Sequence, residues 1–279
     1  MLGIILVSIG TLFEEISDSI GKNKIASREE SPYTMAFLSL FWGGIFFGMA
    51  SLIKNDLFIF RLESLPTFLI RAIFEIIQLY VSVLAIARAD RTTFSFLRTL
   101  TIPLLLMVDL FLGYRLGLFG IVGISVITLT TLLLFSRHEI KKNGSGFVIF
   151  SAINAVFTIS LFKYNITNFN SVVAEQLLMY IILLTAFFFI SIVKAKENPF
   201  IFLVKPVFLL QSFSVGLGGM VESFAFNYGA ASLIIAAKRS AAIFWSLLSG
   251  KKYFKEKNVI FKVLITILLA LGLVFLSLN

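Results

Sequence analysis

The sequence predicts an all-α membrane protein with ten transmembrane helices that form two inverted five-helix repeats. Its 279 residues are 58% hydrophobic and only 14% charged, and the mean hydropathy is +0.98. Soluble domains average roughly 45–50% apolar and about 25% charged residues, so this chain carries more apolar surface than one aqueous core could bury. Because a bilayer-spanning helix needs about 20 mainly apolar residues, the length accommodates about ten helices with their turns.

Composition excludes several classes of protein. The apolar excess argues against a soluble enzyme and a disordered regulator, and the absence of cysteine excludes a disulfide scaffold and thiolate chemistry. The net charge of +9 comes from small, scattered groups of Lys and Arg, which argues against a nucleic-acid partner. The single histidine, His138, lies in a polar loop and has no second histidine with which to share a metal. We therefore expect no metal site.

Apolar runs separated by short polar breaks define the expected helices. The first run is interpreted as a retained helix and not as a signal peptide, because no Lys or Arg precedes Lys22. Four prolines, among them Pro32 and Pro206, stand at or just before expected helix starts, where a missing N–H costs little. Pro103 instead lies inside the fourth span and should kink it. In chain order, the expected spans are 2–20, 33–53, 65–87, 92–111, 116–135, 147–163, 172–193, 207–227, 231–249 and 259–277.

The two halves of the chain resemble each other weakly at an offset of about half its length. In each half, a basic residue lies about a turn and a half into the helix that follows a short polar turn: Arg98 in the first half, Lys238 and Arg239 in the second. The same shift aligns Lys22 with Lys163. Five helices per half is an odd number, so the second half should insert from the opposite side, as in many secondary transporters. The expected repeats are 1–136 and 147–279, joined by a polar linker at 137–146.

Two stretches carry a resemblance to a known family: ARADRTTFSFLRTLTIPLLLMVDLFLGYRL at 87–116 and NYGAASLIIAAKRSAAIFWSLLSGKKYFKEK at 227–257. They resemble the end of the third helix and the fourth helix of an EamA-type domain, once in each half, as in the drug/metabolite transporter superfamily. The Gly-Glu-Arg turn usual in that family has Tyr114 in place of glutamate in the first half, whereas Glu256 keeps the acid in the second. Ala242 stands where similar proteins often have proline.

This resemblance implies ten helices, no cofactor, a central cavity where the two halves meet, and a small-molecule substrate whose identity varies between members. It also suggests an integral, multi-pass protein in the plasma (inner) membrane of a bacterium. Lys and Arg concentrate in the odd-numbered loops, and positive loop charge marks the cytoplasmic side. We therefore expect the odd-numbered loops to face the cytoplasm and both termini to lie outside.

Ionisable residues inside the expected spans are the main candidates for a site. Such residues cost about 2.5–3.5 kcal/mol on insertion scales, and they usually face a cavity or a partner. Glu14 and Glu15 lie near the middle of the first span, although a shorter helix would place them in a wet interface. In the third span, Glu75 and Gln78 share one stripe with Arg71, so Arg71 and Glu75 could instead form a self-neutralised structural pair.

The second half adds further candidates. Glu222 lies deep in the eighth span, and Lys238 shares a face of the ninth span with Trp245, as a cavity wall would require. The side chains of Arg98 and Arg239 are long enough to extend from their depth in the helix to the membrane–water interface. Such snorkelling is therefore an alternative to a binding role for both residues. The candidate substrate-binding or coupling residues are therefore Glu14, Glu15, Glu75, Gln78, Arg98, Glu222, Lys238 and Trp245.

The leading functional hypothesis is a secondary carrier in the lipid bilayer that moves a small organic metabolite by alternating access. A cavity with both acids and bases suits a zwitterionic or polar solute, either amino-acid-like or nucleoside-like. Because desolvation favours the protonated form of a carboxylate, a deep glutamate could also couple transport to the proton. The alternatives are a non-transporting scaffold or receptor, and an intramembrane enzyme. The sequence holds neither an HExxH nor a GxSxG motif, which argues against the enzyme.

Overall fold

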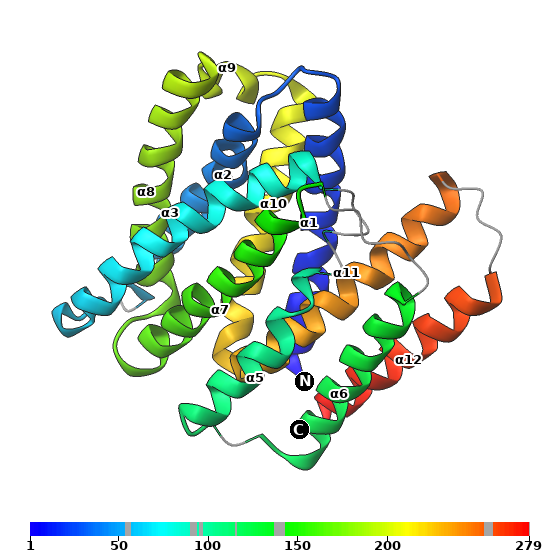
Figure 1. The fold of residues 1–279 in the computed structure, drawn as a ribbon. Coiled ribbons are helices and arrows are strands. Elements are labelled where there is room, and N and C mark those ends of the chain that lie inside the picture. The colour runs from blue at the N-terminus through cyan, green and yellow to red at the C-terminus, as the bar shows by residue number, and fades with distance from the viewer. Residues whose placement is uncertain are drawn as a thin grey trace.

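The computed structural model describes residues 1–53, 57–89, 94, 97–114, 116–136, 143–253 and 259–278. Four features predicted from the sequence fall outside these ranges: His138, most of the polar linker at 137–146, Arg115 and Glu256. Throughout the described ranges the chain forms helices and connecting turns, and it contains no strand (Figure 1). The prediction of an all-α protein is therefore confirmed.

Each predicted span overlaps one helix of eleven or more residues, although the ends differ. The helices of the first half are α1 (Leu2–Ala26), α2 (Pro32–Ile53), α3 (Leu65–Arg88), α5 (Thr101–Phe111) and α6 (Leu118–Phe135). Those of the second half are α7 (Ser145–Asn168), α8 (Val172–Ile190), α10 (Pro206–Ala225), α11 (Ala231–Tyr253) and α12 (Val259–Ser277). Short elements that the hydropathy pattern did not indicate are η2 (Leu62–Ser64), η3 (Ser191–Ala195), α9 (Pro199–Leu203) and η4 (Phe226–Tyr228).

Prolines mark helix starts as their chemistry requires. Pro32 and Pro206 are the first residues of α2 and α10, where the fixed φ suits a first turn and no N–H is missed. Pro103, which was expected to kink a continuous helix, is the third residue of α5. A turn at residues 99–100 interrupts the chain before it, so the helix begins anew at Thr101.

Helix α1 continues six residues beyond the predicted end of its span, to Ala26. Half of the added residues are polar: Lys22, Asn23 and Lys24. Lys24 pairs with Glu29 at 2.8 Å, and the hydroxyl of Ser27 also donates to Glu29. Hydropathy detects where a helix leaves an apolar environment, whereas the helix itself ends at these capping contacts.

The helices pack in pairs that join the two halves of the chain. In Figure 1, α1 runs through the middle of the bundle, where it packs on α10 and α11. Helix α3 packs on α7, α2 on α8 and α10, and α6 on α12. The contact between α1 and α10 is backbone to backbone, because a Cβ at Gly10 would lie 2.8 Å from the carbonyl oxygen of Gly218. Small residues at such crossings allow helices to approach closely without hydrophobic side chains between them.

Among the residues that the structure describes, five helices are long and apolar enough to cross a membrane: α2, η2 with α3, α7, α8 with η3, and α10 with η4. Many large apolar side chains are exposed on the outside of the bundle, among them Ile73, Met107 and Phe111. An exposed apolar exterior of this extent is expected of an integral membrane protein. Helix α1 is long enough to cross a membrane, but it carries Glu14, Glu15 and Asp18 in its second half. These acidic side chains indicate a role other than contact with lipid.

Candidate functional site

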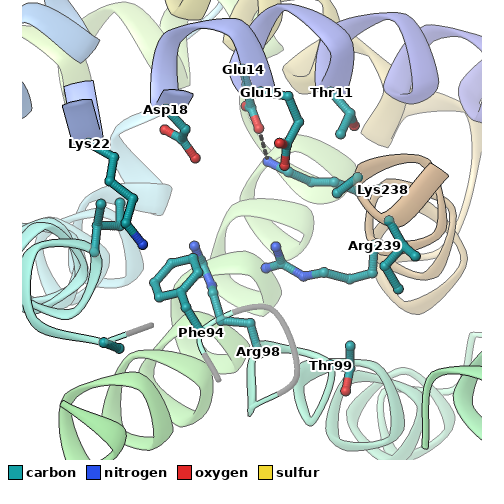
Figure 2. A pocket seen from close by; sticks show the side chains of 14 residues that line it. Thr11, Glu14, Glu15, Asp18, Lys22, Phe94, Arg98, Thr99, Lys238 and Arg239 are labelled. Atoms are coloured by element: carbon teal, nitrogen blue, oxygen red, sulfur yellow. Dashed lines mark ion pairs between the residues drawn. The ribbon is translucent and has the colours of Figure 1, made fainter. Parts of the chain in front are cut away.

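A cavity of about 100 Å³ lies among α1, the end of α3, the residues just before α5, and α11 (Figure 2). Its volume is sufficient for several water molecules, since one water needs roughly 10–15 Å³ measured in this way. Nine of its fourteen lining residues are polar or charged although the surrounding helices are apolar. The lining residues are Thr11, Glu14, Glu15, Asp18, Lys22, Ile86, Ala89, Phe94, Arg98, Thr99, Lys238, Arg239, Ala242 and Ile243.

One wall of the cavity is a stripe of α1. Thr11, Glu14, Asp18 and Lys22 follow each other at steps of three or four residues, and Glu15 lies beside Glu14. Residues at this spacing lie on one face of a helix, so the periodicity alone directs these side chains into one space. Figure 2 shows Glu14, Glu15 and Asp18 pointing from α1 toward the opposite wall.

A three-residue ion cluster joins α1, α10 and α11. The ammonium nitrogen of Lys238 lies 2.7 Å from Oε2 of Glu14 and 2.5 Å from Oε2 of Glu222. All three side chains are largely buried, with 13–21% of their surface exposed. The single positive charge is therefore shared between two carboxylates from different helices, and charge-assisted hydrogen bonds of this length are strong.

Arg98 and Arg239 enter the cavity from two sides, one from the segment before α5 and the other from α11 (Figure 2). The Nε atom of each guanidinium is buried and has no hydrogen-bond partner. Arg98 also stacks over the ring of Phe94, with 5.3 Å between the guanidinium carbon and the ring centre. The described residues form no ion pair with either guanidinium, so these two cations differ from Lys238.

Four of the residues predicted from the sequence meet in this cavity: Glu14, Glu15, Arg98 and Lys238. Glu222 does not line the cavity but reaches it through Lys238. Trp245 lies outside the lining, and its Nε1 donates to the backbone oxygen of Ser8 at 3.1 Å, which joins α11 to α1.

The sequence-based candidates did not include Asp18, Lys22 and Arg239, which also line the cavity. Lys22 was interpreted as a helix end, and Arg239 as equally suited to snorkelling. The signal that could have found Asp18 and Lys22 was the four-residue step from Glu14 along α1.

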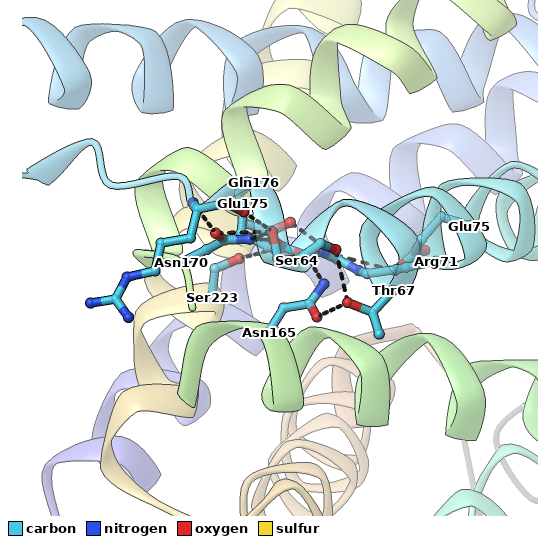
Figure 3. A network of polar contacts seen from close by, with 10 residues as sticks. Ser64, Thr67, Arg71, Glu75, Asn165, Asn170, Glu175, Gln176 and Ser223 are labelled. Atoms are coloured by element: carbon cyan, nitrogen blue, oxygen red, sulfur yellow. Dashed lines mark hydrogen bonds and ion pairs between the residues drawn. The ribbon is translucent and has the colours of Figure 1, made fainter. Parts of the chain in front are cut away.

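Glu75 lies in a separate polar network that joins α3, α7, α8 and α10 (Figure 3). Arg71 is its centre: Nη1 donates to Glu175 at 2.9 Å, and Nη2 donates to Glu75 at 3.4 Å and to Gln176 at 3.1 Å. The predicted Arg71–Glu75 pair is thus present, but Arg71 makes its shortest ion pair with Glu175. The remaining members are Ser64, Thr67, Asn165, Asn170 and Ser223.

Glu175 lies only about one turn into its predicted span, where depth along the span alone would place it at the interface. Its side chain is instead fully buried, at 0% exposure. Besides Arg71, the side-chain amides of Asn165 and Asn170 donate to its two oxygens. Asn165, in the last turn of α7, and Asn170, in the loop between α7 and α8, supply these amides, which replace the water that an interfacial carboxylate would contact.

Asp109 and Lys163 are also buried, although both lie at or near the ends of their predicted spans. Oδ2 of Asp109 accepts a hydrogen bond from the backbone N–H of Ser232 at 2.7 Å, in the first turn of α11. Lys163 donates to the backbone oxygen of Phe226 at 2.6 Å. Both side chains thus satisfy backbone groups where α10 gives way to α11. Asp109 thereby ties the first half of the chain to the second, whereas Lys163 ties α7 to the same turn.

Gln78 contributes to helix packing and does not line the cavity. Its Nε2 donates to Ser82 at 3.1 Å and to Ser151 at 2.9 Å, while its Oε1 accepts from Asn154 at 2.9 Å. These residues are all buried between α3 and α7. A fully satisfied polar cluster of this kind fixes the register of two apolar helices.

Glu30 lies in the turn between α1 and α2 and is only 3% exposed. Gln211 Nε2 donates to its carboxylate, 3.3 Å from each oxygen. Burial raises the pKa of Glu30 to about 8, and the nearby charge of Glu197 acts in the same direction, whereas Gln211 and Lys24 oppose the rise. Glu197 itself accepts hydrogen bonds from residues at the start of α2.

This raised pKa predicts that stability falls as the pH increases. Above the ordinary glutamate pKa of 4.5 the unfolded chain releases a proton that the folded protein keeps until about pH 8. Across this window, stability should decrease by up to about 1.4 kcal/mol per pH unit. Glu30→Gln should flatten the fall when thermal unfolding in detergent is measured from about pH 5 to 8. Glu63→Gln, at an exposed position, is the control, and an unchanged slope in Glu30→Gln would contradict the assignment.

Neither a family model nor a curated protein matches the sequence of this chain. In the part of the chain that the structure describes, no group of three or more His, Cys, Asp or Glu side chains is placed to hold a metal ion. The function is therefore argued from the two polar sites and from the arrangement of the helices.

Proposed function

We propose that this chain is a secondary active transporter of the drug/metabolite transporter type, which moves a small amino-acid-like or nucleoside-like metabolite across a membrane by alternating access. The observation that carries the proposal is the charged cavity: acids and bases from α1, α11 and the segment before α5 converge on one hollow inside an apolar bundle. Charged groups amid hydrocarbon are expensive and are typically kept where a substrate or ion pathway uses them.

The pairing of helices supports ten spans in two inverted repeats. An exchange of the two halves maps α1 on α7, α3 on α10 and α5 on α11. The contact of α1 with α10 then requires a contact of α7 with α3, and the contact of α1 with α11 requires one of α7 with α5. Both required contacts are present. The pairs α2–α8 and α6–α12 map on themselves, as they would across a pseudo-two-fold axis.

The charged cavity and the Arg71 network lie at opposite ends of α3. This arrangement supports a state in which the cavity is accessible from one side of the membrane. The cavity includes Ile86 and Ala89 at the end of this helix, whereas Arg71 and its partners lie near its start. In the proposed cycle, the cavity lies on the side of the odd-numbered loops, which we assign to the cytoplasm of a bacterium. The Arg71 network closes the other side, and the opposite state would require its contacts to open.

The test is solute flux in vesicles that contain the purified full chain. Wild type should move at least one member of a panel of labelled amino acids, nucleosides and other small metabolites, with a rate that depends on pH if the proton is coupled. Glu14→Gln should reduce this flux at least tenfold and remove its pH dependence, because Glu14 lies in the cavity and pairs with Lys238. Glu75→Gln tests in the same assay whether the carboxylate outside the cavity also takes part.

Glu63→Gln serves as the matched control, since Glu63 is exposed in η2 and lies outside the cavity. Transport and a pH profile equal to wild type in both Glu14→Gln and Glu75→Gln would refute these sites. A correctly folded wild-type protein that moves no solute in any direction would favour the alternative of a non-transporting scaffold or receptor.

A further inference from the structure

The cations of the cavity are of two kinds. Lys238 is paired with two carboxylates, and its charge is therefore committed to holding α1, α10 and α11 together. Arg98 and Arg239 have buried Nε atoms without a hydrogen-bond partner, and no described residue forms an ion pair with them. Buried polar side chains are normally satisfied, and two guanidinium groups that point into one hollow need an explanation beyond packing.

The two arginines occupy equivalent positions in the two halves. They are 141 residues apart in the sequence, which is also the separation of Lys22 and Lys163. Arg98 lies just before α5 and Arg239 lies in α11, the two helices that an exchange of the halves would superimpose. Like charges repel, and the acids of the cavity offset part of that cost, but they leave the buried Nε donor of each guanidinium without a hydrogen-bond partner. An anion bound between the two arginines would satisfy these donors.

We propose that the cavity binds the oxyanion group of its solute, a carboxylate or a phosphate, between Arg98 and Arg239. The guanidinium group presents a planar fork of N–H donors that matches both groups in a bidentate manner. This inference rests on the proposed function and narrows it: a solute with a carboxylate, such as an amino acid or a dicarboxylate, fits the site, whereas an uncharged nucleoside does not use the arginines. Glu14, Glu15, Asp18 and Glu222 are the acids whose charges act on this pair.

Binding is measured first, with the purified full chain in a maltoside detergent that contains no phosphate. Thermal shift and calorimetric titration use glutamate, succinate, inorganic phosphate and uridine as probes. We expect at least one of the three anions, and not uridine, to stabilise the wild type. Arg98→Gln and Arg239→Gln should each weaken anion binding about tenfold to hundredfold, the effect of losing a hydrogen bond to a charged group.

Controls separate binding from folding. Arg61→Gln removes an exposed guanidinium outside the cavity and should bind as wild type does. Arg98→Lys and Arg239→Lys keep the charge but lose the fork, so they should retain part of the affinity. Comparison of succinate with phosphate distinguishes a carboxylate from a phosphate. Addition of anionic lipid to the titration shows whether a lipid headgroup competes for the same two arginines.

Flux in vesicles with the same variants separates this inference from the proposed function. If anions bind through Arg98 and Arg239 but no solute crosses the membrane, the oxyanion site stands and the transporter assignment falls. If uridine or a cationic solute is transported, and both glutamine variants keep its affinity and its rate, the transporter stands and the oxyanion site is overturned. An absence of stabilisation by all three anions in the wild type would also overturn the site.

Discussion

Lys238→Met is expected to abolish solute flux and to lower the thermal stability of the protein in the same variant. Its ammonium group is the shared partner of Glu14 and Glu222, at 2.7 Å and 2.5 Å. Without it, two carboxylates from α1 and α10 face each other in a largely buried site with no counter-charge. Removal of one partner from a buried ion pair typically costs about 3–5 kcal/mol. Flux should decrease at least hundredfold, because one wall of the cavity loses both its charge balance and its connection to α11.

A second substitution tests this explanation. In the double variant Lys238→Met/Glu222→Gln, one of the unpaired charges is removed, so part of the stability should return while flux stays low. Lys205→Met, at an exposed position before α10, is the control and should change neither quantity. Wild-type flux and unfolding temperature in Lys238→Met would show that the three-residue cluster has neither role.

The helices could be predicted from the sequence because the features that determine them are local. Apolar runs of about 20 residues and prolines such as Pro32 and Pro206 mark where an apolar helix starts, and both helices begin there. The ends were less accurate, since Ala26 and Asn168 close helices whose last turns are polar. These turns are held by capping and tertiary contacts that hydropathy does not record.

Part of the cavity was also predictable from local spacing. Glu14 and Glu15 were identified by the cost of a charge in an apolar span, and the helical period would have added Asp18 and Lys22. The position of Trp245 depends on a different property, the rotation of α11 against α1. That rotation is set by packing between segments more than 230 residues apart in the sequence, as the Trp245–Ser8 hydrogen bond shows. Knowing which residues lie on one face of a helix does not show which neighbouring helix that face contacts.

Glu175 shows why depth along a span is a poor guide to burial. Its position one turn into α8 suggested a wet interface, but its partner Arg71 is 104 residues away in the sequence, on α3. Only the folded chain brings the two together, with Phe162 below the guanidinium, 4.5 Å from its carbon to the ring centre. The pair should therefore behave as a buried one, with large and coupled effects on stability.

Arg71→Met should accordingly cost more stability than Glu175→Gln. The first variant leaves both Glu75 and Glu175 without a cation, whereas in the second Arg71 keeps Glu75 at 3.4 Å. In addition, the glutamine oxygen can still accept from Asn165, so the amide contacts of the network are partly preserved. We expect losses of about 3–5 kcal/mol for Arg71→Met and less for Glu175→Gln. Chemical unfolding of the full chain in detergent measures both.

The double variant decides whether the pair acts as a unit. Arg71→Met/Glu175→Gln should be more stable than the sum of the single losses predicts, by about 0.5–3 kcal/mol, because the second substitution removes a charge that the first left unpaired. Lys24→Met is the matched control: its ion pair with Glu29 is as close, at 2.8 Å, as the 2.9 Å between Arg71 and Glu175, but Glu29 is half exposed, so its loss should leave stability nearly unchanged. Additive losses in the Arg71–Glu175 cycle would mean that neighbouring amides, and not the ion pair, hold this end of the bundle closed.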